Sequence, residues 1–523
     1  MESFIVAARN DGFGERMCAM LNAMYIAKKT GWTFKFIWQD PPKLENNDQN
    51  VLLPWNDMLP QDLMFSKNFI SQYATKDIPW QYDATLVYYK SLKEITQKPS
   101  KKWNERQIGH YSIQHYLGQQ LHDINTNEYA NILQECWNEI EFTPHIQHII
   151  TQAKCHKNLP TNFTAIHIRC GDILYYFHDE YEAKHKIANP YLAIEIIKRE
   201  IQEDNSIILF SDDLSVLQNI KEQFSSTNKV FIIDDFFERT QHTRLEQSIF
   251  EIMIMSQAKK LYSGISGFSR LANMIGNNQH IIIYSLFNTQ EQYDIISKHI
   301  QQYELPAIHK AFSYMYLFSL AQSLKMSPHT QKTYIQEAIT LNPNSLTYKI
   351  LFVYTLLLNE NYKEANTELK SILEANKKFL DEIFKFSWNI KPNFLYNFIF
   401  PSFFIKSEYY HLYPYIAHIA YQIIIKLQDP NICESTLQNN YKLYFHLMFY
   451  ISNHNNIAKI YLASLSVHKN EKLLKPRYTK LDLTGQFLKF ITKRKIKTLR
   501  KSFLKRYQTA KFYLYRAKKL SPK

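Results

Sequence analysis

The chain has 523 residues, which corresponds to about three domains of ordinary size. Hydrophobic residues make up 45% of the sequence, so the chain can bury a core and wholesale disorder is excluded. The formal net charge of +14 is unevenly placed, because residues 471–523 hold 18 Lys and Arg against only Glu471 and Asp482. The rest of the chain is therefore near neutral, and the total charge does not indicate its partners.

The cysteines are odd in number and widely spaced, with no CxxC pair: Cys18, Cys136, Cys155, Cys170 and Cys433. This pattern argues against a disulfide scaffold or a structural zinc site and fits a reducing compartment. The first residues run straight into a strand-like stretch at 4–8, without a signal-peptide pattern. Two uncharged stretches, 394–405 and 409–425, are too short or too polar for a transmembrane helix.

Residues 1–160 predict a first Rossmann-like domain. A strand at 4–8, a helix at 15–30 that ends at Gly31, and a strand at 33–38 form a β-loop-α-β unit. The rest of this range is less regular, with helices expected around 115–155.

Residues 161–305 predict a second Rossmann-like domain of the α/β class. The expected strands are 164–169, 206–210, 230–233, 261–263 and 280–284, and the expected helices between them are 191–203, 214–224, 245–257 and 268–275. This alternation predicts a parallel, doubly wound sheet, and hence a GT-B-like pair of Rossmann-like domains in the front half of the chain.

Residues 306–470 predict an all-α region. The pattern from Ala338 to Asn342 recurs 34 residues later, from Ile372 to Asn376. This period resembles that of tetratricopeptide helical pairs. A helical bundle with an accidental period stays open as the alternative. The Phe and Tyr residues beyond 385 are expected to form core.

Residues 471–523 predict a basic amphipathic helical tail. Its apolar side chains fall roughly on one side: Ile496, Leu499, Phe503, Leu504 and Tyr507. Basic residues surround them, which is typical of a segment that binds an anionic membrane surface. A nucleic-acid-binding tail and a merely solvated arm remain alternatives.

The sharpest chemical signal runs from His167 to Asp172, at the end of a predicted strand. The guanidinium of Arg169 is planar and permanently charged, so it can pair with a diphosphate. It could also neutralise the charge that develops on a leaving phosphate oxygen. Gly171 permits a sharp turn, and Asp172 could fix the arginine or cap the next segment. His167 could donate to a phosphate or hydrogen-bond in the core.

Three further motifs follow strands. Asp212 and Asp213 could accept from a guanine edge or a ribose hydroxyl, although an N-cap is the simpler interpretation. The loop with Ser266, Gly267 and Ser269 opens a helix and could hold an anion, or be an ordinary turn. Near the N-terminus, Gly12 and Gly14 flank Phe13, and this pair lacks the third glycine of a dinucleotide-binding loop.

Taken in order, these motifs resemble the fucosyltransferase superfamily of α1,2, α1,6 and protein O-fucosyltransferases. The matching parts are the HxRxGD strand end at 167–172, the Ser-Asp-Asp at 211–213 and the Ser-x-x-Ser-Arg-Leu-Ala loop at 266–272. The opening GFGERM at 12–17 is similar to that group's N-terminal glycine loop. The α1,6 type and its nodulation relatives are the nearest pattern, over about residues 4–285.

The resemblance implies a GDP-fucose donor, inversion at the sugar carbon, and no metal or cofactor. It implies that His167 and Arg169 contact the diphosphate, that Asp172 supports their loop, and that Asp212 and Asp213 bind the guanosine. Ser266 and its neighbours, with the glycine loop, would complete the donor site. The α1,6 type has a second arginine where this chain has Cys170.

Inversion also needs a base for the acceptor hydroxyl. The resemblance places it shortly after the arginine, where Glu180 and Asp179 stand; both could equally be exposed loop charges.

We therefore expect a metal-independent bacterial fucosyltransferase. It would act on a glycan or glycolipid acceptor in surface polysaccharide or lipopolysaccharide synthesis, in the cytoplasm and peripherally at the inner face of the cytoplasmic membrane. The alternative is a non-catalytic helical-repeat adaptor with a degenerate transferase fold. A nucleic-acid partner is not expected, because the body is near neutral and lacks an aromatic-basic sheet motif.

Overall fold

The computed structural model describes residues 2–39, 58–81, 84–98, 101–102, 107–177, 180–387, 393–427, 459–460, 462–464 and 467. The chain divides into two compact units, Met1–Thr355 and Leu356–Lys523. The first unit holds both predicted Rossmann-like domains and the first helices of the predicted all-α region. The predicted basic tail at 471–523 lies outside the described residues.

The N-terminal part of the first unit is built on a four-stranded sheet of order β2-β1-β4-β3. Strands β1, β2 and β4 run parallel, and β3 is antiparallel to β4. Its elements are β1 (Glu2–Ala7), α1 (Phe13–Thr30), β2 (Thr33–Phe36), α2 (Gln61–Met64), α3 (Lys67–Tyr73), η1 (Leu86–Tyr88), α4 (Leu92–Gln97), β3 (Lys101–Lys102), β4 (Gln107–Tyr111), η2 (Leu117–Gln119), α5 (Thr126–Glu139) and α6 (Pro144–Lys154).

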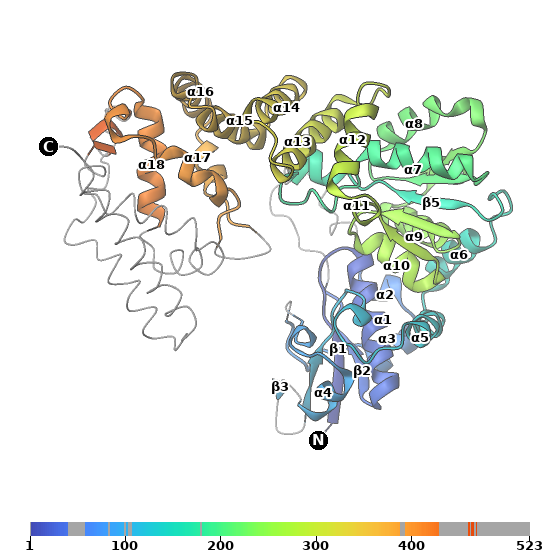
Figure 1. Cartoon of the computed structure of the whole chain (residues 1–523). Helices are drawn as coiled ribbons and strands as arrows, with labels where there is room; N and C mark the ends of the chain where they lie inside the picture. The colour runs from blue at the N-terminus through green and yellow to red at the C-terminus, as the bar shows by residue number, and fades with distance from the viewer. Residues whose placement is uncertain are drawn as a thin grey trace. The chain divides into compact units, whose positions relative to one another are not determined.

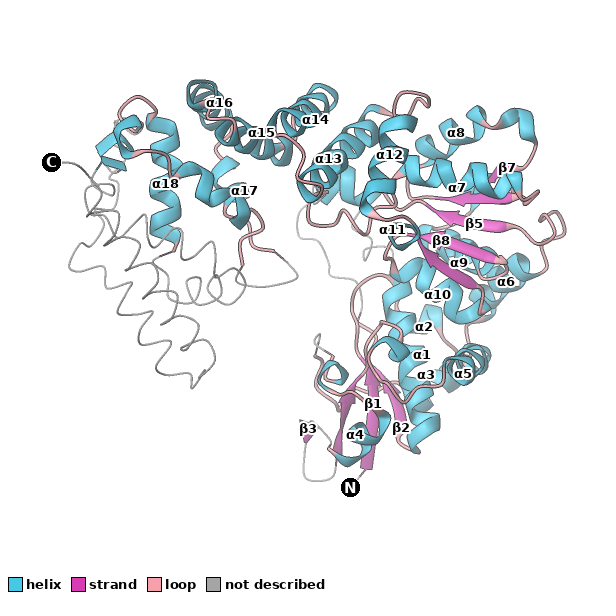
Figure 2. Ribbon diagram, in the orientation of Figure 1, coloured by secondary structure: helices cyan, strands magenta, loops and turns pink. Residues whose placement is uncertain are grey.

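A five-stranded parallel sheet of order β7-β6-β5-β8-β9 follows. Helices lie on both faces of this sheet, with α7 and α8 above it and α9 and α10 below it in Figures 1 and 2. Its elements are β5 (Thr164–His167), η3 (Ile173–Phe177), α7 (Pro190–Gln202), β6 (Ile207–Phe210), α8 (Leu214–Gln223), η4 (Ser225–Thr227), β7 (Val230–Ile232), η5 (Ile233–Asp235), η6 (Arg239–Gln241), α9 (Arg244–Met255), β8 (Lys260–Ser263), α10 (Gly267–Gly276) and β9 (Gln279–Ile282).

The two sheets share one hydrophobic core. Strands β5 and β6 are buried along their whole length, as expected for central strands of a parallel sheet covered on both faces. Helix α1 packs against α5 and α10, and α6 packs against α9. Side chains from both parts, such as Met20 of α1 and Leu271 of α10, belong to a single buried cluster. The α/β class with parallel sheets is thus confirmed.

Helices continue the first unit beyond the second sheet: α11 (Ile283–Leu286), α12 (Thr289–His299), α13 (Ala307–Ser323), α14 (Pro328–Leu341) and α15 (Leu346–Leu358), the last of which runs across the boundary between the units. Helix α12 packs on α7 and α13. Asn189, the N-cap of α7, donates to Ser313 of α13 at 3.3 Å. The first helix of the predicted all-α region is therefore fixed to the second sheet's helices.

The second unit is helical where it is described: α16 (Tyr362–Ala375), α17 (Phe379–Ile383), η7 (Asn397–Phe403), η8 (Ser407–Tyr409) and α18 (Pro414–Lys426). Its aromatic residues include Phe394, Tyr396 and Tyr410, which are buried, as predicted. The 34-residue period has a local structural basis, because Asn342 and Asn376 each cap the C-terminus of a helix. None of the helices in the described residues has both the length and the apolar character needed to span a membrane.

Candidate functional site

The strand order of the second sheet creates a switch point between β5 and β8. From β5 the chain moves outward through β6 to β7, then returns to the other side of β5 and continues through β8 to β9. The loops that leave β5 and β8 therefore diverge at the carboxyl ends of neighbouring strands, where open parallel sheets bind ligands. We call this region, 167–172 with 264–269, the switch-point edge. Both of its loops were predicted as functional from the sequence.

Arg169 lies on the first loop of the switch-point edge. Its Nη2 donates to Asp172 Oδ2 at 2.7 Å and its Nε to Oδ1 at 3.3 Å, so Asp172 fixes the guanidinium. Burial opposes the charge, but the Asp172 carboxylate raises the pKa of Arg169, which is positive at any working pH. The side chain keeps 27% of its surface exposed. Its Nη1 has no hydrogen bond within the described part of the chain and can serve an anion.

The Asp212 carboxylate holds the loop that carries Arg169 through two hydrogen bonds to its backbone. One carboxylate oxygen accepts the backbone N–H of Cys170 and the other that of Asp172, both at 2.9 Å. A Cβ on Gly171 would lie 2.9–3.0 Å from Asp212, so only glycine fits there. The structure thus gives Asp212 a role that the guanosine prediction missed, because both oxygens already hold the Arg169 loop.

His167 ends β5 and joins the two loops. Its ring stacks on Phe268 of α10 with 5.2 Å between centroids. Burial, and then the charge of Arg169, lowers the pKa of His167 to about 3, so the imidazole is neutral at pH 7. Its Nδ1 is buried and has no hydrogen-bond partner in the described residues. An unsatisfied polar atom within electrostatic range of Arg169 points to a ligand at this edge.

The serine side chains of the second loop, 264–269, find their hydrogen-bond partners within the protein. The Ser266 hydroxyl accepts from the Phe268 N–H at 3.2 Å as the N-cap of α10. Ser269 is fully buried and donates to the Ser266 carbonyl at 3.3 Å. A Cβ on Gly267 would lie 2.5–2.8 Å from the Glu15 side chain. Glu15 therefore occupies the helix N-terminus where a phosphate was expected, and the predicted contacts through Ser266, Gly267 and Ser269 are not supported.

The N-terminal glycine loop meets this second loop directly. A Cβ on Gly14 would lie 2.6 Å from the Gly267 carbonyl carbon, so Gly14 permits the two backbones to touch. Gly12 has open space around its Cα and caps α1. The two glycines thus shape the junction between the halves, whereas the sequence predicted that they contact the donor.

An ion pair crosses the same junction. Arg270 of α10 donates from Nη1 to Glu15 Oε2 at 2.9 Å and to the Gln114 carbonyl at 3.1 Å. Arg16 donates to the carbonyls of Asn10 and Asp11, at 3.1 and 2.7 Å, and so fixes the loop before α1. The carboxyl ends of β1 and β4 are thereby held against the switch-point edge.

Lys186 and His115 extend the charged surroundings and were not singled out from the sequence. Burial lowers the pKa of Lys186, and Arg169 lowers it further, while Glu15 and Asp172 raise it, so all four groups lie within electrostatic range. Partial desolvation by neighbouring groups, followed by the charge of Arg270, lowers the pKa of His115, although the residue is open to solvent. Both residues sit in loops whose folding brings them here, and no local motif marks either one.

Asp213 is engaged inside the protein. Its Oδ1 accepts from the N–H and hydroxyl of Ser215 as the N-cap of α8, and its Oδ2 bonds His309 Nε2 at 2.7 Å. Although burial opposes this, the hydrogen bonds from His309 and Ser215 hold the pKa of Asp213 well below its ordinary value. Both carboxylate oxygens thus have partners within the protein, and the guanosine contact of Asp213 stays a prediction.

Cys170 joins Asp213 and His309 in a cluster of potential metal ligands, with donor atoms within 4.8 Å of one another. Burial raises the pKa of the Cys170 thiol well above its ordinary value, and its Sγ contacts the Ile168 carbonyl and the Ser211 hydroxyl at 3.4 Å. A metal would have to break the hydrogen bond between Asp213 and His309. The three residues fit a hydrogen-bonded cluster that ties α13 to α8 better than they fit a metal site.

Glu180 does not suit the base predicted for it. The residue is 2% exposed, and its Oε1 accepts from the Ser345 hydroxyl at 3.0 Å. An acceptor hydroxyl would have to reach a carboxylate that the protein already covers. Asp179, the other predicted base, lies outside the described residues.

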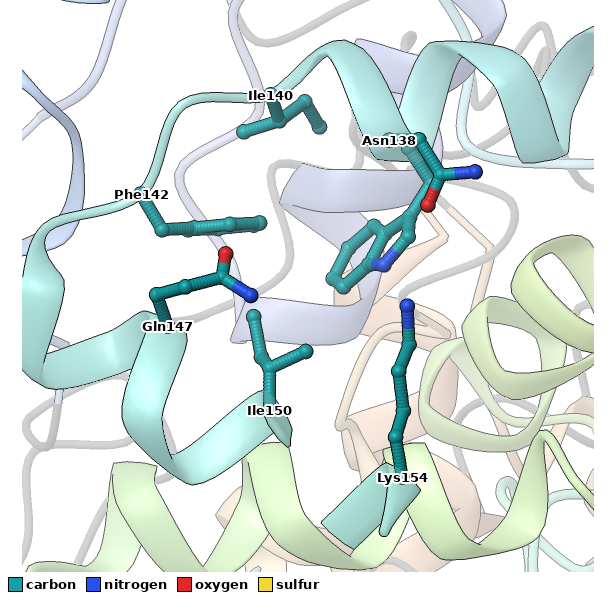
Figure 3. Close-up of a pocket in the computed structure, with 7 residues that line it drawn as sticks. Asn138, Ile140, Phe142, Gln147, Ile150 and Lys154 are labelled. Atoms are coloured by element: carbon teal, nitrogen blue, oxygen red, sulfur yellow. The ribbon is translucent and has the colours of Figure 1, made fainter. Parts of the chain in front are cut away.

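A small pocket elsewhere has no residue in common with the switch-point edge. It lies between α5 and α6, and Figure 3 shows Lys154 entering it below Ile140 and Asn138. Its volume of about 90 Å³ is well under the roughly 300–1,000 Å³ of typical ligand pockets. It is too small for a nucleotide sugar.

No family profile matches the sequence, and no curated protein sequence matches it. Among solved structures, the chain is similar to the fucosyltransferase NodZ from Bradyrhizobium, with 12% identity and a TM-score of 0.31 over 52% of this chain and 93% of NodZ. It is also similar to POFUT1 in complex with GDP-fucose, with 10% identity and a TM-score of 0.33 over 54% of this chain and 98% of POFUT1. Similarity at this level assigns neither substrate nor reaction to the chain.

Proposed function

We propose that this chain is a glycosyltransferase that moves fucose from GDP-fucose to a glycan or glycolipid, with inversion and without a metal. The observation that carries this proposal is the position of Arg169 at the switch point. Asp172 holds its guanidinium through Nε and Nη2, and Nη1 can donate to a ligand. The unsatisfied Nδ1 of His167, a residue within electrostatic range of Arg169, supports a polar ligand there. The choice of GDP and fucose rests on the resemblance of the sequence motifs, above all the HxRxGD strand end at 167–172, to the fucosyltransferase superfamily.

In this proposal Arg169 stabilises the leaving diphosphate. Charge grows on the phosphate oxygen as the bond to the sugar breaks, and a preorganised guanidinium stabilises that charge more than it stabilises the bound donor. Lys186 adds a second positive charge nearby. These two cations supply the charge that a metal ion provides in other transferases.

The proton of the acceptor hydroxyl needs a base on the opposite side of the sugar. The N-terminal half offers two groups. The Asp11 carboxylate is 26% exposed, is paired with Arg9 and lies within electrostatic range of Lys186. His115 is exposed and lies within electrostatic range of Arg270. In D11N and H115A enzymes, the variant that loses kcat while keeping its Kd for GDP identifies the base.

The biological setting follows from the same proposal. Synthesis of a bacterial surface polysaccharide or lipopolysaccharide would place the enzyme in the cytoplasm, peripherally at the inner face of the cytoplasmic membrane. The 18 basic residues of 471–523 would supply the contact with anionic lipid.

Calorimetric titration tests the proposal. In EDTA, the protein should bind GDP and GDP-fucose but not UDP-sugars. Arg169→Ala should weaken GDP binding by roughly 2–4 kcal/mol, because it removes a charged partner from a partly buried diphosphate. Lys154→Ala, in the separate pocket between α5 and α6, is the matched control and should change nothing. A protein that binds no GDP would instead fit the adaptor alternative.

A further inference from the structure

Trp80 stands out because it is a large aromatic side chain left in solvent at the end of the first sheet. It is 41% exposed, whereas Trp38 and Trp137 are 9% and 3% exposed. Its indole is nevertheless held in place, since Nε1 donates to the Ala8 carbonyl at 2.9 Å. An exposed ring that is also anchored presents a flat surface with little rotamer entropy left to lose on binding.

The backbone around Trp80 is tied to the two central strands of that sheet. The Tyr111 hydroxyl, from the end of β4, donates to the Pro79 carbonyl, and Tyr111 exchanges backbone and side-chain hydrogen bonds with Thr85. The Ala8 carbonyl is the first beyond β1. The ring is therefore placed by strand ends and not by a free loop.

This position adjoins the junction with the switch-point edge. Ala8 is followed directly by Arg9, which pairs with Asp11, and Arg16 holds the Asp11 carbonyl at 2.7 Å. Asp11 and Glu15 both lie within electrostatic range of Lys186, as Arg169 does. Trp80 thus borders the acceptor-side loop of the proposed reaction, on the half that does not carry Arg169.

We propose that Trp80 is the platform on which a pyranose ring of the acceptor glycan stacks. The inference rests on the proposed function. A pyranose has one face of C–H groups that packs on an aromatic ring, and hydroxyls at its edge that hydrogen-bond to neighbouring polar groups. Asp11, paired with Arg9, offers such a group on the loop that follows the Ala8 carbonyl, to which the indole is bonded. A sugar fits this combination better than an apolar partner, which would leave the ion pair unsolvated.

Fluorine NMR of the full chain labelled with 5-fluorotryptophan tests the platform. The Trp80 resonance is assigned by its loss in W80F, and the protein is titrated with methyl glycosides of glucose, galactose, mannose and N-acetylglucosamine. We expect at least one glycoside to shift the Trp80 resonance, while the buried Trp38 and Trp137 resonances stay in place. Glycerol, which has no ring face, should shift none of them.

Variants at Trp80 show whether a loss of sugar binding comes from the missing aromatic ring or from a disturbed fold. Saturation-transfer signals from the binding glycoside should fall at least fivefold in W80L and be partly retained in W80F, which keeps a ring but not the indole N–H. Leu63→Ala, at another exposed apolar residue, is the control. A calorimetric Kd for GDP on each sample shows that the fold and the donor site are intact.

The outcomes are distinct. If GDP binds and no glycoside shifts Trp80, the platform is refuted and the transferase proposal stands. If glycosides shift Trp80 but GDP does not bind, the protein is a sugar-binding protein and the transferase proposal fails. If W80L retains the full saturation-transfer signal, the sugar binds elsewhere and the platform is again refuted.

Discussion

At the residue scale, His167 links the chemistry of the site to acid stability. Its pKa is about 3 in the folded protein, because burial and Arg169 disfavour its charge, against 6.5 in the unfolded chain. The unfolded state therefore binds more protons between these values. The stability that His167 contributes is complete above pH 6.5 and is lost as the pH falls toward 3.

Replacing His167 with Phe should remove this acid sensitivity while keeping a ring against Phe268. Between pH 7 and pH 5 the wild type should lose about 2 kcal/mol more unfolding free energy than H167F, from the pKa difference alone. Urea titrations at both pH values measure this difference. His148→Phe, at an exposed position of α6, should behave like the wild type. Equal losses in H167F and wild type would contradict the buried, neutral state of His167.

Individual side chains of the site were only partly predictable from the sequence. Arg169 and Asp172 were identified from their place after an apolar strand, and their pairing was one of the two arrangements expected. Ser269, Asp213 and Glu180 were predicted as site residues, yet each side chain hydrogen-bonds to another part of the protein. His309 and Ser345, the partners of Asp213 and Glu180, are distant in sequence, so no local pattern reveals them. Ser269 instead bonds the nearby Ser266 carbonyl, as in an ordinary turn.

At the element scale, the loop after β5 depends on Asp212, which accepts two of its backbone N–H groups. Asp212→Ala should leave both donors without a partner, at a cost of about 1–3 kcal/mol shared between stability and binding. Amide hydrogen exchange at Cys170 and Asp172 should speed up, and GDP should bind several-fold more weakly. Asp77→Ala, in an exposed turn, is the control. Unchanged exchange at both amides would refute the clamp.

The elements of the second sheet were predictable because each has a clear periodicity. All five strands and the four helices between them lie within two residues of the predicted bounds. Strand β4 was missed, because Gln107, Gly109 and His110 interrupt its apolar pattern. The α1–α10 contact was also unpredictable, since a sequence shows the apolar face of a helix but not which helix covers it.

At the scale of the whole molecule, the basic segment 471–523 lies outside the described residues, and its role stays a prediction. A chain that lacks it should lose binding to vesicles of phosphatidylglycerol and phosphatidylcholine, because the net charge of the protein falls from +14 to −2. Co-sedimentation at low and high salt measures this loss. The GDP affinity of the shortened chain should match that of the full chain. Binding that persists without the segment, or that ignores salt and lipid charge, would sink the prediction.

The contact between Gly14 and Gly267 has a mechanical consequence. No side chain fits between these two backbones, and the Glu15–Arg270 pair lies beside them. A close backbone contact of this kind acts as a hinge point. If the parts built on the first and second sheets separate during substrate entry, they rotate about this contact and do not slide past each other. Groups near this contact, such as Glu15, would then hardly move, while parts of each half far from it would travel furthest. Turnover would accordingly be more sensitive to a methyl group added at Gly14 than to most changes in the surrounding loops.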